Sequence, residues 1–208
     1  MIKTIVFDFG NVLIDWSPYY LYSPYFRNEE TCRYFVENVI DRKWFTQIDK
    51  GRPMDVCTAE LTDAYPEYAQ PISFFRDRWF EMCRGQIEGM QELVEELKGR
   101  GYGIYGLSNW PAETFPGALE RFPVLGLMEG YVVSSYVNLV KPDIAIYKLL
   151  IERFGLNPSE SLFIDDREEN VEGARKAGMK SLRFDGVEAL KDSLQTILEL
   201  GINRPELS

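Results

Sequence analysis

Four short polar segments of this 208-residue chain carry side chains that can act in catalysis. They are Asp8-Phe-Gly-Asn11, Ser108-Asn109, Lys141 and Asp165-Asp166. If the three carboxylates meet in the folded protein, they repel one another unless a cation offsets their charge. A hard cation with oxygen ligands, usually Mg²⁺, meets this need. A carboxylate beside such a cation can serve as the nucleophile in phosphoryl transfer, with the Lys141 ammonium neutralising the transferred group.

The elements around these segments predict how they could meet. The apolar, β-branched run at 2–7 predicts a buried strand that stops at Asp8. Further strands are predicted at 102–107, 131–134, 162–164 and 181–184, alternating with helices at 90–100, 112–121, 143–154, 168–177 and 187–200. This alternation indicates an α/β fold with a doubly wound parallel sheet. In such a fold, the residues that follow the strands form the ligand site.

Residues 16–84 have a helical pattern instead. Apolar residues at 29–40 recur at the spacing of one helix face, and a short helix with Trp44 follows. Pro53 suits the first turn of a third helix, and Pro71 opens a fourth. The many aromatic residues of this segment are enough for a core of its own. We therefore expect a small four-helix subdomain at 16–84, inserted into a core formed by 1–15 and 85–208.

Composition excludes several functions. With 23 Lys and Arg against 33 Asp and Glu, the net charge is −10, which argues against nucleic acid or an anionic membrane as partner. The chain has no histidine, so His-dependent nucleophiles and His-ligated metals are excluded. The widely spaced Cys32, Cys57 and Cys83 are typical of buried, reduced thiols. No stretch is apolar enough for a signal peptide or a membrane span, and we expect a cytoplasmic protein.

As a set, the polar segments resemble the motifs of the haloacid dehalogenase superfamily of hydrolases. The motifs occupy 6–14, 107–109, 141–147 and 163–178, in the expected order and at the expected strand ends. The resemblance implies a Rossmann-like core, a helical cap formed by the insertion, and Mg²⁺-dependent hydrolysis of a small phosphorylated metabolite. The Gly10-Asn11 form of the first motif is similar to that of bacterial sugar-phosphate phosphatases that act on glucose 1-phosphate.

The resemblance also implies a set of metal ligands. Asp8 would be both the nucleophile and a Mg²⁺ ligand, and the backbone carbonyl of Gly10 would be a second ligand. Asp166 would complete the protein's contacts with the metal. Asp165 would either ligate the metal or hold a water bound to it.

Other residues are implied to bind phosphate or to support the site. Ser108 and the backbone N–H of Asn109 would bind the phosphoryl oxygens. Lys141 would pair with both Asp8 and the phosphate. Asn170 would orient the loop that carries the acidic pair, and Asn11 would support the first motif.

One departure from the family pattern concerns the proton donor. Phosphatases of the family commonly carry a second aspartate two residues after the nucleophile, which protonates the leaving group, and Gly10 takes that position here. Losing such a group typically costs about 10² to 10⁴ in rate. Asp15 or Asp49 could substitute, although either could instead serve as a turn or helix-cap residue.

The loop at 49–52, with Arg42 and Trp44 before it, is expected to touch the part of the substrate beyond the phosphate. Arg52 and Trp44 are accordingly predicted as substrate-binding residues, with an ordinary polar turn as the alternative. We expect the substrate to be a sugar phosphate and the protein to be a monomer, with an oligomer left open.

Two other functions fit parts of the pattern. A 2-haloacid dehalogenase also uses an Asp nucleophile, a Ser-Asn pair and a Lys, and it needs no metal. The acidic pair Asp165-Asp166 argues against it, because carboxylates beside a metal-free nucleophile would raise its pKa. A non-catalytic phosphate-binding module would explain the missing acid at Gly10, but the intact nucleophile, lysine and metal carboxylates argue against it.

Overall fold

A five-stranded parallel sheet forms the centre of the chain in the computed structural model, which describes residues 1–198. Its strand order is β5-β4-β1-β6-β7, so β1 lies in the middle and pairs with β4 and β6. This arrangement confirms the predicted doubly wound sheet. The strands are β1 (Thr4–Phe7), β4 (Gly103–Ser108), β5 (Gly130–Val133), β6 (Ser161–Asp165) and β7 (Lys180–Arg183).

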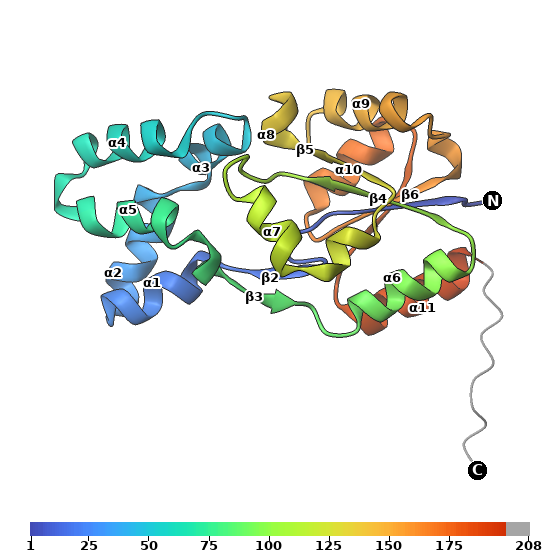
Figure 1. Cartoon of the computed structure of the whole chain (residues 1–208), viewed down its shortest axis with the longest axis horizontal. Coiled ribbons are helices and arrows are strands. Elements are labelled where there is room, and N and C mark those ends of the chain that lie inside the picture. Colours follow the sequence, from blue (N-terminus) through green and yellow to red (C-terminus); the bar gives the residue numbers. More distant parts are fainter. Residues whose placement is uncertain (199–208) are drawn as a thin grey trace, which may run out of the picture.

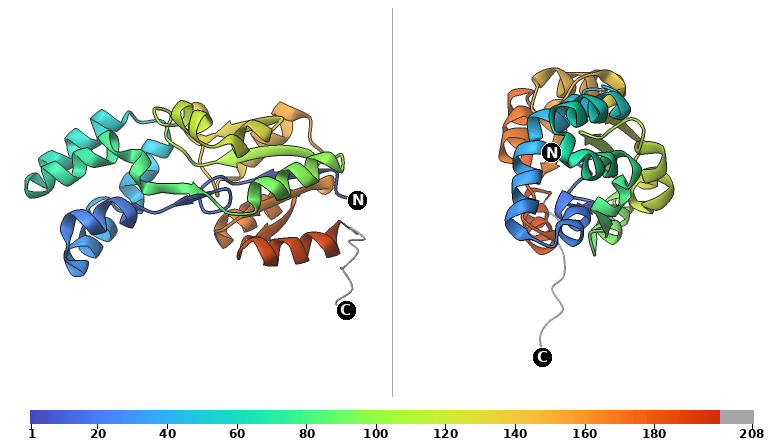
Figure 2. Two further views of the ribbon diagram at one scale, coloured as in Figure 1. Left: turned by 60° about the horizontal axis from the view of Figure 1, so that its bottom comes forward. Right: turned by 90° about the vertical axis from the view of Figure 1, so that its left-hand side faces the viewer.

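Helices cover both faces of this sheet (Figures 1 and 2). Successive side chains of a strand point to opposite faces. Ile5 and Phe7 accordingly pack in the same cluster as residues of α6, α7 and α11, whereas Val6 packs in a second cluster with residues of α9 and α10. These helices are α6 (Met90–Gly99), α7 (Phe115–Arg121), α9 (Ile144–Phe154), α10 (Glu168–Lys176) and α11 (Val187–Ile197).

The remaining elements of the core are short. They are α8 (Ser134–Val137) and the 3₁₀ turns Pro123–Leu127 and Pro158–Glu160. The predicted helix at 112–121 starts later than expected, at Phe115, because residues 112–114 form a turn. The predicted end of the last helix, 199–200, lies outside the described residues.

An antiparallel ribbon of β2 (Ile14–Trp16) and β3 (Cys83–Gln86) carries the helical insertion. Its helices are α1 (Pro18–Phe26), α2 (Glu29–Tyr34), α3 (Arg42–Asp49), α4 (Met54–Ala64) and α5 (Ala69–Asp77). A π-helical turn at Phe35–Val39 continues α2, and 3₁₀ turns occupy Pro66–Tyr68 and Trp79–Met82.

The expectation of four helices was wrong in one respect, since α1 was not predicted. Its buried residues, Leu21 and Tyr22, are adjacent in sequence and so give no stripe at helical spacing. Its start is marked instead by Ser17, whose side chain accepts a hydrogen bond from the backbone N–H of Tyr19, and by Pro18 in the first turn.

The insertion packs around aromatic side chains and lies beyond the carboxyl ends of the central strands (Figure 1). The rings of Tyr22 and Phe35 are 4.9 Å apart between centroids, as are those of Trp44 and Phe75. These side chains belong to the same continuous cluster as Ile5 and Phe7 of the sheet. No helix within residues 1–198 combines the length and the apolar character that a membrane span requires.

Candidate functional site

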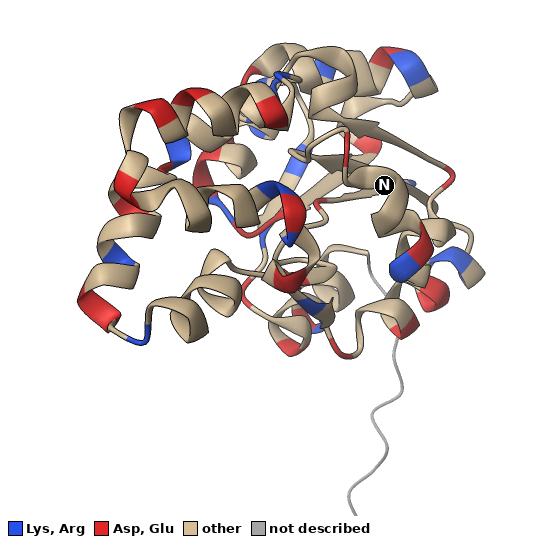
Figure 3. Cartoon of the chain, turned by 60° about the vertical axis from the view of Figure 1, so that its left-hand side comes forward, with Lys and Arg blue, Asp and Glu red and all other residues tan. Residues whose placement is uncertain are grey.

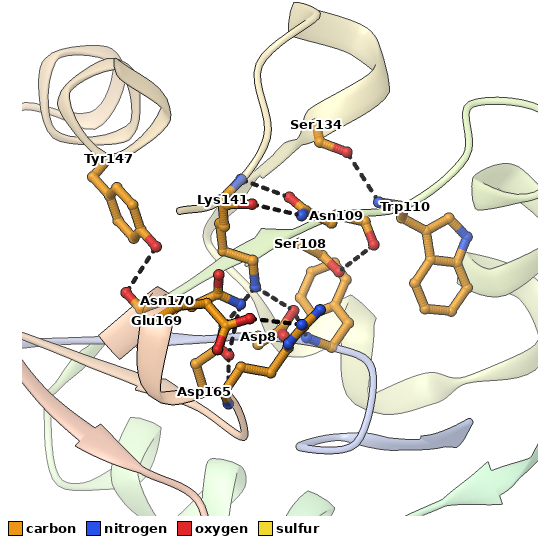
Figure 4. Close-up of polar contacts among 12 residues, drawn as sticks. Asp8, Ser108, Asn109, Trp110, Ser134, Lys141, Tyr147, Asp165, Glu169 and Asn170 are labelled. Carbon is orange, nitrogen blue, oxygen red and sulfur yellow. Dashed lines mark hydrogen bonds and ion pairs between the residues drawn. The ribbon is translucent and has the colours of Figure 1, made fainter. Parts of the chain in front are cut away.

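The ends of three neighbouring strands bring the predicted catalytic residues together (Figure 4). Asp8 directly follows β1, Ser108 ends β4 and Asp165 ends β6. Lys141 comes from the loop between α8 and α9. The backbone N–H of Asp8 donates to the carbonyl of Ile164 at 2.9 Å, which extends the pairing of β1 with β6 up to the site.

Lys141 lies between two of the carboxylates. Its Nζ is 2.7 Å from Oδ1 of Asp8 and 2.6 Å from Oδ2 of Asp165, and all three side chains are buried. Burial alone would lower the pKa of Lys141, but Asp165 and Asp8 together raise it by more than burial lowers it, so the ammonium stays charged. Burial also raises the pKa of Asp8 against the opposing effect of Lys141, and Asp165 adds to the increase. The single ammonium of Lys141 thus lies beside a cluster of three aspartates, Asp8, Asp165 and Asp166.

The side chain of Asn109 holds the backbone of Lys141 in place. The side-chain Oδ1 of Asn109 accepts from the backbone N–H of Lys141 at 2.9 Å, and its Nδ2 donates to the carbonyl at 3.1 Å. The Oγ of Ser108 lies 3.5 Å from the carbonyl of Asn109. A contact of this length is weak, so it competes little with a ligand for the Ser108 hydroxyl. The amide side chain of Asn109 is thus a positioning group, and its backbone is the part that remains for a ligand.

Asp165 is held by three donors. Its Oδ1 accepts from Nδ2 of Asn170 at 2.9 Å and from the backbone N–H of Arg167 at 3.0 Å, and its Oδ2 binds Lys141. Asn170 is itself fixed by the hydroxyl of Tyr147, which donates to its carbonyl at 2.8 Å. Of the two implied roles for Asp165, these bonds favour the indirect one, in which it orients other groups beside the metal.

Carboxylate oxygens of Asp8, Asp165 and Asp166 all lie within 4.8 Å of one another. Burial and the neighbouring Asp165 raise the pKa of Asp166 to about 6. Oδ1 of Asn170 is buried and has no hydrogen-bond partner among the described residues. Mg²⁺ prefers hard oxygen ligands, and this site offers three carboxylates and the side-chain amide oxygen of Asn170, so its chemistry fits that ion. The Asp8 and Asp166 carboxylates and the Gly10 carbonyl would hold it.

Asn11 forms the turn that leads from the first motif into the ribbon. Its backbone has φ 57°, a left-handed conformation that asparagine tolerates better than most residues. Its Oδ1 accepts from the backbone N–H of Trp16 at 3.1 Å. Asn11 therefore connects the strand that leads to Asp8 with the ribbon that carries the insertion.

A cavity of about 130 Å³ lies between these residues and the insertion. This is far more than the ~10–15 Å³ that one water needs. From the core, the predicted residues Asp8, Gly10, Asn11, Asn109, Lys141, Asp166 and Asn170 line it. From the ribbon and the insertion, Trp16, Arg42, Phe45, Thr46, Asp49 and Trp79 line it.

The prediction that Trp44 and Arg52 contact the substrate is not supported by their positions. Trp44 is buried inside the insertion, where its Nε1 donates to the carbonyl of Cys57 at 3.2 Å. Arg52 turns to Glu60, with NH2 2.7 Å from Oε1. The reason lies in the faces of α3, because residues 42, 45, 46 and 49 follow the i, i+3, i+4, i+7 spacing toward the cavity, whereas Trp44 and Ile48 face the insertion.

Several cavity residues were missed by the sequence analysis. Trp16, Trp79, Trp110 and Arg167 line the cavity but belong to none of the predicted binding positions. The indole Nε1 groups of Trp16 and Trp79 are buried and have no hydrogen-bond partner within residues 1–198. Helical spacing within α3 could have pointed to Phe45, but no local pattern indicates the tryptophans.

Charged side chains at the rim link the insertion to the core. NH1 of Arg42 and NH2 of Arg167 lie 2.8 Å and 2.6 Å from the same Oε1 of Glu169. Elsewhere, basic positions are scattered among acidic ones over the helices that face the viewer in Figure 3.

Comparisons with known proteins identify the family of this chain. The model of the haloacid dehalogenase-like hydrolase family matches residues 5–184. The sesquiterpene phosphatase astK of Aspergillus oryzae is 28% identical over 206 residues, which cover 95% of this chain and 94% of that protein. The phosphorylated carbohydrates phosphatase of Thermotoga maritima is 24% identical over 200 residues, covering 96% of this chain and 91% of that protein.

The fold is also similar to solved structures. A magnesium complex of a HAD family enzyme from Bacteroides thetaiotaomicron superposes with a TM-score of 0.72 at 19% identity, over 91% of this chain and 98% of that one. At this identity the likeness concerns the fold. The family match over residues 5–184 shows that this chain is an enzyme of the haloacid dehalogenase-like hydrolase family.

Proposed function

We propose that the chain is a Mg²⁺-dependent phosphatase that hydrolyses small phosphomonoesters through an aspartyl-phosphate on Asp8. The observation that carries this proposal is the buried Lys141 ammonium, 2.7 Å from Asp8, in a cavity that Asp166 also lines. The phosphatase relatives support the reaction class.

The residues of the site have separate tasks in this reaction. A carboxylate oxygen of Asp8 attacks the phosphorus, and Lys141 offsets the charge of the phosphoryl group from one side. Ser108 and the backbone N–H of Asn109 bind its oxygens. Mg²⁺ held by Asp8, Gly10 and Asp166 would supply further neutralisation of that charge when bound.

Sugar phosphates are the substrate class that we favour. The two phosphatase relatives bear names that point to different substrates, a sesquiterpene and phosphorylated carbohydrates. The indole N–H groups of Trp16 and Trp79 have no hydrogen-bond partner within residues 1–198, and they are donors that a hydroxylated leaving group can satisfy and a hydrocarbon cannot. The aromatic rings themselves suit the apolar faces of a sugar.

The helical insertion acts as the cap of the site in this proposal. It closes the cavity through the Arg42–Glu169 ion pair and a hydrogen bond of 2.8 Å from the backbone N–H of Met54 to Glu113. Trp79 and Trp110 also pack across the boundary, with ring centroids 4.8 Å apart. Enclosure excludes water from the reacting groups and strengthens their electrostatic interactions.

The test is hydrolysis of p-nitrophenyl phosphate and a panel of sugar phosphates with Mg²⁺ or with EDTA. We expect Mg²⁺-dependent release of phosphate, abolished in Asp8→Asn. Activity that survives EDTA and releases chloride from 2-chloropropionate would identify a dehalogenase instead. A folded parent protein that hydrolyses no phosphate ester would leave the non-catalytic module as the better description.

A further inference from the structure

We infer that Asp49 of the insertion donates the proton to the leaving group and later accepts the proton of the attacking water. In related phosphatases an aspartate at the position of Gly10 takes this role, and glycine has no carboxyl group with which to do so. The inference rests on the proposed phosphatase function and adds a catalytic residue to it.

The first support is the placement of Asp49. It is the last residue of α3, is 5% exposed, and lines the cavity together with Asp8 and Lys141. Its Oδ1 is buried and lacks a hydrogen-bond partner in the described part of the chain. A buried carboxyl that is already used for structure would have its oxygens paired, so this oxygen is free to meet a ligand.

Stability gives no reason for an aspartate at this position. An unpaired buried polar atom lowers the stability of the folded protein. The C-terminal end of a helix also disfavours negative charge, because the backbone carbonyls there carry the negative end of the helix dipole. Residues that break such rules without a structural benefit are expected at functional sites.

Both ends of α3 are attached to the core, which fixes Asp49 over the site. At the start, Arg42 pairs with Glu169 at 2.8 Å. Just after the end, Gly51 has φ 93° and packs on α8 so closely that an added Cβ would lie 2.6 Å from Oδ1 of Asn138 and 2.7 Å from the carbonyl of Ser135. Only glycine permits this approach.

The protonation state of Asp49 suits the role. Burial raises its pKa from 3.8 to about 7, against the opposing effect of the charges on Lys141 and Arg42. A carboxyl group with a pKa near neutrality can give up a proton and take one back at physiological pH.

Asp15, the other candidate, is engaged elsewhere. Its Oδ1 accepts from the hydroxyl of Tyr20 at 2.7 Å. Asp15 does not belong to the lining of the cavity that Asp8 and Asp49 share. Among these two carboxyl groups, only Asp49 can face a leaving group bound there.

The two chemical steps then balance. An oxygen of Asp8 forms a bond to phosphorus while the bond between phosphorus and the ester oxygen breaks. The ester oxygen takes the proton of Asp49, and the leaving group departs as an alcohol. Water next attacks the phosphorus, Asp49 takes one of its protons, and the bond between phosphorus and Asp8 breaks. The products are inorganic phosphate, the regenerated Asp8 carboxylate and protonated Asp49.

The test compares leaving groups. In Asp49→Asn, we expect kcat/KM for a sugar phosphate to fall by about 10² to 10⁴. The leaving group of p-nitrophenyl phosphate needs little protonation, so kcat/KM for this substrate should fall by less than about 10-fold. Asp63→Asn is the matched control, because Asp63 is an exposed acid of the same insertion. Equal losses on both substrates, or no loss, would overturn the inference. Loss of all activity in Asp8→Asn tests the phosphatase proposal separately.

A second variant guards against a merely structural effect. Among the described residues, no atom lies within 4 Å of a Cβ built at Gly10, so a side chain can begin there without a clash. Adding Gly10→Asp to Asp49→Asn should restore at least about 10-fold of the lost activity on the sugar phosphate, if proton donation is the missing step. No recovery in a double variant with an unchanged thermal unfolding midpoint would contradict the role of Asp49.

Discussion

Nζ of Lys141 lies 2.7 Å from Oδ1 of Asp8, and both side chains are buried at the carboxyl edge of the sheet. The pair forms because β1 ends at Asp8 while the Asn109 side chain holds the backbone of Lys141 opposite it. The ammonium is shared with Asp165, so its removal would leave two buried carboxylates without their common partner.

Replacing Lys141 by Met should therefore cost both activity and stability. Breaking a buried ion pair from one side typically costs about 3–5 kcal/mol. Urea unfolding measures this loss, and p-nitrophenyl phosphate hydrolysis should fall below detection. Lys191→Met is the control, since Lys191 pairs with Glu188 on the surface and should change stability by less than about 1 kcal/mol. A Lys141→Met protein as stable as this control would contradict the prediction.

The two neighbouring aspartates should respond differently to magnesium. Asp166 lines the cavity, whereas both oxygens of Asp165 already accept hydrogen bonds or bind Lys141. In Asp166→Asn, the Mg²⁺ concentration for half-maximal activity should rise by at least about 10-fold. In Asp165→Asn, we expect a lower kcat that saturating Mg²⁺ does not restore. Titration of activity with Mg²⁺ distinguishes the two, and the reverse pattern would exchange their roles.

The stability of the metal-free protein should fall as pH rises, and Asp49 should contribute to the fall. Because its folded pKa is raised from 3.8 to about 7, the folded state binds more protons than the unfolded chain between these values. The free energy of unfolding therefore decreases across this range. Asp49→Asn should match the parent near pH 4 and exceed its stability at pH 8.

Urea unfolding in EDTA at pH 4, 6 and 8 measures this difference. Asp63→Asn, which removes the same charge at an exposed position of the insertion, is the control for a general effect of net charge. Parallel curves for the parent and Asp49→Asn would show that Asp49 does not retain its proton in the folded state.

Gly51→Ala should lower activity through the position of Asp49. Gly101 provides the control, because it has a similar φ of 89° and no described atom within 4 Å of an added Cβ, whereas Gly51 has φ 93° and contacts α8. Each substitution should cost about 1–2 kcal/mol from the left-handed backbone. Only Gly51→Ala should also reduce kcat/KM for sugar phosphates, and equal activities of the two variants would contradict this.

The indole groups should determine recognition of the leaving group. Trp16→Phe and Trp79→Phe keep an aromatic ring but remove an N–H that has no partner within the described residues. The KM for sugar phosphates should rise by roughly 3- to 10-fold, the equivalent of one hydrogen bond. Trp44→Phe removes an N–H that is bonded to Cys57 outside the cavity, and it should leave this KM unchanged. A larger effect at Trp44 would restore its predicted role in substrate binding.

The core of the fold and the arrangement of its motif residues could be predicted because they depend on local patterns. A buried β-branched run specifies β1, and Asp8 must follow it at the edge where all parallel strands end. The same reasoning places Ser108 after β4 and Asp165 at the end of β6. The helix α1 could not be found in this way, because its buried residues have no helical period.

The sequence by itself determined which groups are available, namely carboxylates, a lysine and a serine. It also shows that position 10 is a glycine and that the chain has no histidine to donate the proton in place of an aspartate there. Only the tertiary structure decided which face of α3 meets the cavity, so that Asp49 reaches it and Trp44 does not. The physical reason is that one face of α3 packs inside the insertion and another lies at the cavity between the insertion and the core. Periodicity locates two such faces but does not say what each one covers.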